Sequence, residues 1–223
     1  IGSIISDGWY AGNIANRGQN YYGNNLRFRV QILIQFSDGH IDTIASDSTW
    51  RASYGPILEA DMQAGEAVDA RLSMRGWNEN GFHDKNWAMV RAIDTTTAPL
   101  LAYPGVPVRK TQEIIPKKIF EPSPGVYLVD MGQNFSGWAK LSLKGVKGQK
   151  VMLRYGEMLN SDSTLHTRNL RSARSSDTYI FSGSESEVYE PRFTYHGFRF
   201  VEITGLTEKP TKQQIVGVVL HSN

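Results

Sequence analysis

The chain has 223 residues, of which 24 are Lys or Arg, 22 are Asp or Glu, none is Cys, and 40% are hydrophobic. The formal net charge of +2 argues against a nucleic-acid partner, and no apolar run approaches the roughly 18–20 residues that span a membrane, so neither partner is expected. The absence of Cys excludes disulfides, thiolate zinc sites, iron–sulfur clusters and cysteine nucleophiles.

The first half of the chain contains one strongly periodic segment. Residues 1–6 resemble the end of a strand that lacks its beginning. Residues 26–36 carry an apolar side chain at every second position, which predicts a half-buried strand. Asp38 and Gly39 predict a hairpin turn, because Gly tolerates the positive φ angles of such turns, and residues 41–45 return as the partner strand.

The rest of the chain is also rich in strand signals. In residues 60–74, Gly65 interrupts a weak apolar face, which favours a turn and a strand over a helix. The Thr-rich segment 95–99 is typical of a linker. Turns are expected at residues 131–134 and 144–148. The strands expected in this half cover residues 126–130, 138–143, 151–155, 178–181, 198–203 and 215–220.

This pattern predicts an all-β protein with two antiparallel β-sandwich domains in tandem. The charge changes at the expected linker: residues 1–98 carry 8 basic and 11 acidic side chains, and residues 99–223 carry 16 and 11. We therefore expect one domain over 1–98 and a second over 99–223. Both chain ends fall in strand-like segments, so we expect the sequence to be the front portion of a longer protein.

No catalytic motif is recognisable. There is no Gly-x-Ser-x-Gly elbow, no His-Glu-x-x-His and no phosphate-binding loop, and the five histidines are scattered. His196 stands out because it lies in an aromatic segment, yet a His-Gly step within a strand more often marks a bulge than an active site. Four carboxylates fit either a glycosidase acid/base pair or ordinary surface positions, namely Asp130, Glu157, Asp177 and Glu202. The residues alone predict no enzyme.

A binding role has better support. An indole stacks on the apolar face of a sugar ring, while neighbouring amides and carboxylates bond its hydroxyl groups. The segment 54–87 supplies this combination, and we take Asp69, Trp77, Asn78 and Trp87 as candidate carbohydrate-binding residues. Oxygen-rich loops also bind Ca²⁺, so Asp69 is a weak calcium candidate. The alternative is that the tryptophans belong to the core and the acids form turns.

Several segments together resemble the bacterial α-L-rhamnosidases of glycoside hydrolase family 78. In the first half these are residues 7–12, 50–57, 65–71, 76–77 and 87. In the second half they are residues 124–138, 157–159, 169–173, 177–179 and 191–201. Each segment alone is weak, but in this order and spacing they cover nearly the whole chain.

The resemblance implies jelly-roll or concanavalin-like sandwiches and a parent enzyme that cleaves terminal α-L-rhamnose with inversion. The two catalytic acids of that family lie on an (α/α)₆ barrel that follows these domains, so the fragment itself is expected to be inactive. Its partners would be that barrel and rhamnose-containing glycans. Where some members bind calcium through an Asp followed by Asn, Asp69 is followed here by Ala70, and no cofactor is expected.

The basic second half suggests a docking face for the missing barrel. The candidates for it are Asn169, Arg171, Arg174, His196 and Arg199; alternatively, Asn169 and Arg171 only stabilise their own loop. Two other functions stay open: a stand-alone carbohydrate-binding or adhesive module, and a glycosidase whose site the sequence does not reveal. A periplasmic or extracellular location is favoured over the cytoplasm.

Overall fold

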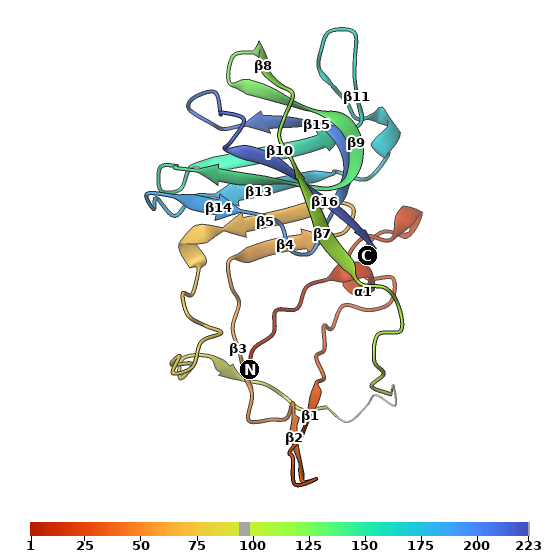
Figure 1. The fold of residues 1–223 in the computed structure, drawn as a ribbon, viewed down its shortest axis with the longest axis vertical. Coiled ribbons are helices and arrows are strands. Elements are labelled where there is room, and N and C mark those ends of the chain that lie inside the picture. Colours follow the sequence, from red (N-terminus) through yellow and green to blue (C-terminus); the bar gives the residue numbers. More distant parts are fainter. Residues whose placement is uncertain (94–98, 223) are drawn as a thin grey trace.

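The computed structural model describes residues 1–93 and 99–222, and the fold is almost entirely β (Figure 1). The all-β prediction is confirmed. The short helices are α1 (Gly8–Ala11) and the 3₁₀ turns η1 (Ala15–Arg17), η2 (Ala70–Leu72) and η3 (Arg168–Leu170). Within the described ranges, no helix is long and apolar enough to cross a membrane. The expected linker lies almost wholly outside the described residues.

Within residues 1–93 and 99–222, sixteen strands follow one another. They are β1 (Gln31–Gln35), β2 (Ile41–Ala45), β3 (Arg51–Ala52), β4 (Ile57–Asp61), β5 (Gly65–Asp69), β6 (Ala88–Met89), β7 (Val108–Ile114), β8 (Lys118–Ser123), β9 (Val126–Leu143), β10 (Lys150–Gly156), β11 (Met158–Leu159), β12 (Leu165–His166), β13 (Ser176–Ile180), β14 (Glu187–Tyr189), β15 (His196–Thr204) and β16 (Ile215–Ser222). Each strand expected in the second half overlaps an observed strand, with most bounds within two residues, and the segments expected at 126–130 and 138–143 both belong to β9.

Ten strands form one strongly curled sheet around the main core (Figure 1). The order is β4-β5-β13-β10-β15-β9-β16-β7, and β14 and β8 also pair with β9. Side chains alternate between the core and the outside, as period-two sequence requires. In β10, for example, Val151, Leu153 and Tyr155 are fully buried, whereas Lys150 is exposed. The largest buried side chains include Phe181, Phe198, Leu141, Ile203 and Ile215.

Strand β9 overturns one expectation. The turn expected at residues 131–134 is absent, and the strand runs unbroken for 18 residues. Gly132 takes a φ of +86°, which bends the chain without ending the strand, and its N–H bonds to the Asp130 carboxylate at 2.7 Å. The first part of β9 pairs with β8 and the last part with β16 and β14, while β15 pairs with β9 from Val126 to Gly137. The bend thus lets one strand serve both sides of the curled sheet.

The segment 57–72 joins the sheet of the second half. As the sequence predicted, β4 and a turn lead into β5, which η2 follows. β5 pairs in parallel with β13 through three residue pairs, so strands far apart in sequence lie side by side. Gly65 makes this possible, because its φ is +109° and a Cβ there would lie 2.0 Å from the Ser176 carbonyl oxygen. The division at residues 98 and 99 stays a prediction.

The remainder of the first half has little core. β1 and β2 form the predicted hairpin, and Gly39 lies in its turn with a φ of +88°. The prediction that one face of this hairpin is buried is wrong, since Ile34, Phe36 and Ile44 are 38–44% exposed. β1 and β2 lie at the opposite end of the molecule from β8 and β11 (Figure 1). Residues 1–6 form no strand; Gly2 instead packs against the ring of Trp77.

Candidate functional site

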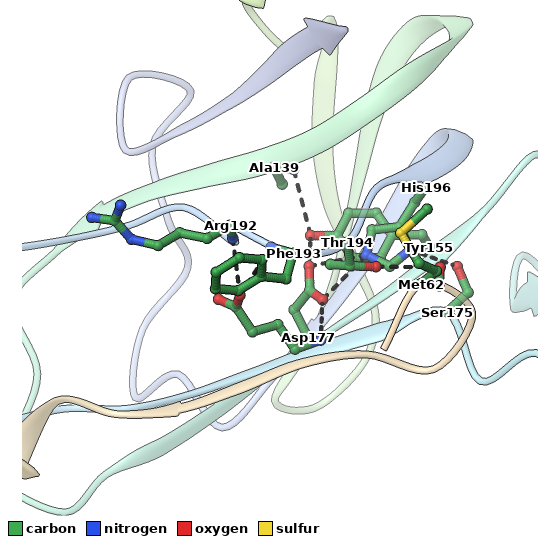
Figure 2. A network of polar contacts seen from close by, with 10 residues as sticks. Met62, Ala139, Tyr155, Ser175, Asp177, Arg192, Phe193, Thr194 and His196 are labelled. Carbon is green, nitrogen blue, oxygen red and sulfur yellow. Dashed lines mark hydrogen bonds and ion pairs between the residues drawn. The ribbon is translucent and has the colours of Figure 1, made fainter. Parts of the chain in front are cut away.

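A buried polar cluster lies at the seam between β5 and the sheet of the second half (Figure 2). Its centre is Asp177 on β13, which is fully buried. The Tyr155 hydroxyl donates to Asp177 Oδ2 at 2.7 Å, and the backbone N–H of Glu66 donates to Oδ1 at 2.9 Å. The His196 ring places Nε2 3.1 Å from Oδ2. Asp177 therefore joins strands β5, β10 and β15.

His196 is oriented on both sides of its ring. Nδ1 lies 3.1 Å from the Ser175 hydroxyl, and the ring stacks on Tyr155 with centroids 3.9 Å apart. A neutral His196 can donate from Nε2 to Asp177 and accept the Ser175 hydroxyl hydrogen at Nδ1. Ser175 in turn anchors the first half, because its backbone N–H donates to the Gln63 carbonyl at 3.0 Å.

Glu66 is the acidic side chain that β5 sends into this cluster. It is 1% exposed, and its Oε2 accepts the backbone N–H groups of Arg192 at 2.9 Å and Phe193 at 3.3 Å. Its Oε1 has no hydrogen-bond partner. Burial raises the pKa of Glu66 to about 7; the two backbone donors oppose this shift, and the charge of Asp177 adds to it.

A glutamate with a raised pKa beside an aspartate is the chemistry of a glycosidase acid/base pair. Here, however, Glu66 and Asp177 are 1% and 0% exposed, and both are enclosed by strands. No substrate can reach them, so the cluster holds the seam together rather than performing hydrolysis. Sequence reasoning noted Asp177 and His196 separately but missed Glu66, Tyr155 and Ser175. These residues come together only through the pairing of β13 with β5 and β10, and of β10 with β15.

An open groove of about 710 Å³ lies where residues 2–4 meet the sheet. Trp77 and Trp138 line it, together with Lys110, Glu190 and Arg192. Glu190 Oε2 accepts from the Lys110 ammonium at 2.7 Å and from the Trp138 indole N–H at 3.1 Å. Burial would raise the pKa of Glu190, but these two donors outweigh burial and lower it. The groove combines aromatic faces with a fixed carboxylate and cations.

The other three predicted carbohydrate-binding residues do not line this groove. Asp69 ends β5, and both of its carboxylate oxygens are held by the Arg71 guanidinium at 2.6–2.8 Å. Those hydrogen bonds lower the pKa of Asp69. Asn78 is exposed, and Trp87 packs edge-on against Phe82. Among residues 1–93 and 99–222, no group of three or more His, Asp or Glu side chains is placed to bind a metal ion.

The predicted docking residues fall into two groups. His196 lies in the buried cluster, so it cannot form part of an exposed surface, and Arg174 pairs with Glu59 of β4 at 2.5 Å. The four candidates other than His196, Arg174 included, are accessible. Arg199 makes two hydrogen bonds to Asp130, Asn169 donates to Glu157 at 3.3 Å, and Arg171 is exposed with a φ of +54°. The bulge expected at His196-Gly197 instead falls between Phe198 and Phe200.

Two family models match the chain in succession. The α-L-rhamnosidase N-terminal domain matches residues 1–112, and the bacterial α-L-rhamnosidase concanavalin-like domain matches residues 120–221. The chain belongs to the bacterial α-L-rhamnosidase family. This confirms the resemblance found in the sequence, and the concanavalin-like match covers the strands that follow β7.

Known α-L-rhamnosidases are similar over the whole chain. An α-L-rhamnosidase of Streptomyces avermitilis is 42% identical over 100% of the chain, which covers 22% of that protein. One from Alteromonas sp. (strain LOR) is 35% identical, again over 100% of the chain and 25% of its own length. The crystal structure of the S. avermitilis enzyme with L-rhamnose superposes with a TM-score of 0.92, covering 97% of this chain and 21% of that one. The chain thus spans about a quarter of the length of these relatives.

Proposed function

We propose that this chain is a non-catalytic β-region of a longer α-L-rhamnosidase, one that supports a catalytic part elsewhere in the same polypeptide. The observation that carries the proposal is the pair of accessory-domain matches, over residues 1–112 and 120–221, in a chain that spans about a quarter of its relatives. The burial of Glu66 and Asp177 supports it, because the acid/base-like pair has no access to a glycoside.

Activity measurements test this proposal. The purified 223-residue chain is expected to release no aryl alcohol from an aryl α-L-rhamnoside, whereas the full-length parent protein does so under the same conditions. Rhamnoside hydrolysis by the chain alone, abolished by Asp177→Asn, would overturn it. A parent reading frame that stops at Asn223 would favour the alternative of a stand-alone carbohydrate-binding or adhesive module.

The support role requires a surface that meets the catalytic part. Arg171 suits it because its exposed guanidinium makes no hydrogen bond or ion pair within residues 1–93 and 99–222. Arg199 is half-exposed on β15, and Asn169 lies in η3, two positions before Arg171. In the full-length parent, Arg171→Ala with Arg199→Ala should loosen domain packing, seen as faster limited proteolysis between the domains. Arg75→Ala is the matched control on an exposed arginine near η2, and unchanged proteolysis in the double variant would disprove docking.

Carbohydrate binding belongs to the same proposal, and the groove beside Trp77 favours it. A volume of about 710 Å³ lies within the usual range for a small-ligand site, and the Lys110–Glu190 pair offers both a donor and an acceptor to sugar hydroxyls. Because Arg71 occupies the carboxylate of Asp69, binding is expected not to require Ca²⁺.

Titration of L-rhamnose with and without Ca²⁺ tests the binding component. Tryptophan fluorescence should change saturably in the unmodified chain, equally in both conditions, and the change should be lost in Trp77→Ala. Trp9→Ala is the matched control, since Trp9 is 47% exposed and does not line the groove. No fluorescence change and no heat, or an undiminished response in Trp77→Ala, would remove this component.

A further inference from the structure

The β4–β5 hairpin forms one edge of the ten-stranded sheet and joins the rest of that sheet through β13. Its parallel pairing with β13 covers only three residue pairs. Outside this pairing, the backbone N–H groups of Ser175 and Ser176 donate to the hairpin loop at 3.0 Å, and the Thr194 hydroxyl donates to the Met62 carbonyl at 3.4 Å. Arg174 pairs with Glu59 at the surface. β4 is the first strand in the sheet order, so among the described residues no further strand pairs with the outer edge of the hairpin. As an edge unit, the hairpin can detach from β13 without breaking the pairing between any other strands of the sheet.

Glu66 is the most buried acidic side chain of the hairpin, and the charge of Asp177 acts on it. The carboxylate of Asp177 on β13 is the acidic group whose charge acts on Glu66. The hydroxyl groups of Tyr155 on β10 and Tyr189 on β14 also interact with Glu66, and His196 on β15 contacts Asp177. Arg192, after β14, bonds to Glu66 through its backbone N–H. The acids of the hairpin itself, Glu59, Asp61 and Asp69, are engaged by Arg174, Asn13 and Arg71.

An ionised Glu66 is poorly accommodated in this position. Within the described residues it forms no ion pair, its Oε1 has no hydrogen-bond donor, and a second carboxylate lies in the same buried cluster. A buried charge without a partner is costly, so the docked hairpin favours the neutral acid. Once the hairpin leaves the sheet, Glu66 is hydrated and ionises freely.

We propose that the proton on Glu66 acts as a latch: while it is bound, the β4–β5 hairpin stays docked on β13, and its loss favours release of the hairpin. The sign follows from the two states. Glu66 titrates near its ordinary value of 4.5 when released and at about 7 when docked. Docking is therefore strongest below pH 4.5 and weakens as the pH rises toward 7.

Hydrogen exchange of the 223-residue chain, compared at pH 5 and pH 8 after correction for intrinsic rates, tests the latch. Protection of the amides of residues 57–69 should fall by roughly 50-fold between the two pH values, as a shift from 4.5 to about 7 requires. Protection in β10 and β15 should change far less. Glu66→Gln, which mimics the neutral acid, should keep the hairpin protected at both pH values.

Glu59→Gln is the matched control, because Glu59 lies in the same hairpin and pairs with Arg174 at the surface. This variant should show the same steep pH dependence as the unmodified chain. Three results would overturn the latch: equal protection of the hairpin at both pH values, a Glu66→Gln profile as steep as that of the unmodified chain, or an equal loss of protection across β10 and β15, which would indicate global unfolding.

Discussion

At the scale of single residues, the seam depends on a few buried side chains that hydrogen-bond across several strands. Tyr155 shows how tightly they are used: its hydroxyl donates to Asp177 at 2.7 Å and accepts the Ala139 backbone N–H at 3.4 Å. Burial, followed by the charge of Asp177, raises the pKa of Tyr155 well above its ordinary value, so it stays a donor at any physiological pH.

Tyr155→Phe removes that donor without changing the packed ring. We expect it to lower the free energy of unfolding by about 2 kcal/mol, because two buried groups lose a partner at once. Urea denaturation measures the change. Tyr127→Phe is the control, since Tyr127 is 5% exposed and its hydroxyl takes part in no hydrogen bond among the described residues. Equal losses in the two variants would show that Asp177 does not depend on Tyr155.

At the scale of elements, Gly65 fixes how closely β5 can approach β13. Gly65→Ala would place a methyl group 2.0 Å from the Ser176 carbonyl oxygen, at a φ of +109° that Ala rarely adopts. We expect a loss of about 3 kcal/mol or more of stability, a value typical of forced backbone clashes in a packed core. Thermal or urea unfolding provides the measurement.

Gly39→Ala is the comparison for Gly65→Ala. Its φ of +88° is equally unfavourable for Ala, but a Cβ there meets no atom within 4 Å. The loss should be about 1 kcal/mol, which is the conformational cost alone. If both glycine variants lost the same stability, close packing of β5 on β13 would not be the reason for Gly65.

The elements of the second half could be predicted because each strand carries its own signal. In β10 and β15, buried and exposed positions alternate within one strand, and period two is visible without knowing the neighbours. The bend at Gly132 was missed, since a glycine inside a strand and a glycine in a turn look alike in sequence. The apolar face of β1 was predicted to be buried, but it is largely exposed. A sequence pattern shows that a face is apolar; it does not show that another part of the described chain packs on that face.

The candidate site was less predictable than the fold. Trp77 does line a groove, as its type and its polar neighbours suggested, but its counterpart Trp138 lies 61 positions later in the chain. Asp69 attracted attention as a binder because nothing in sequence shows that Arg71 would turn back to hold it. Glu66 was missed for a related reason: its burial depends on a parallel pairing between segments more than 100 residues apart.

At the scale of the whole molecule, two kinds of acid set how stability depends on pH. Hydrogen bonds from Arg71 and Arg199 lower the pKa values of Asp69 and Asp130, so their stabilising effect is present above about pH 4 and is lost in stronger acid. Glu66 acts in the opposite direction. Its raised pKa stabilises the folded chain below pH 4.5, and this contribution disappears as the pH rises to about 7.

The free energy of unfolding should therefore be greatest near pH 4–5 and should fall by about 3 kcal/mol between pH 4.5 and pH 7.5, the amount that a shift of this size represents. Urea titrations at a series of pH values measure the curve. Glu66→Gln should flatten the decline above pH 4.5 and leave the acid side unchanged. If the free energy of unfolding still declined above pH 4.5 in this variant, groups other than Glu66 would be responsible for the decline.

The parallel pairing of β5 with β13 has a practical consequence for how the protein can be divided. A protein that began after residue 98 would lack β4 and β5. It would leave β13 with an open row of backbone donors and acceptors, and it would remove the strand that covers Asp177. Such an open edge invites pairing with another chain. The shortest form of the concanavalin-like region that stays monomeric should therefore include residues 57–69, either in the same chain or added as a separate peptide.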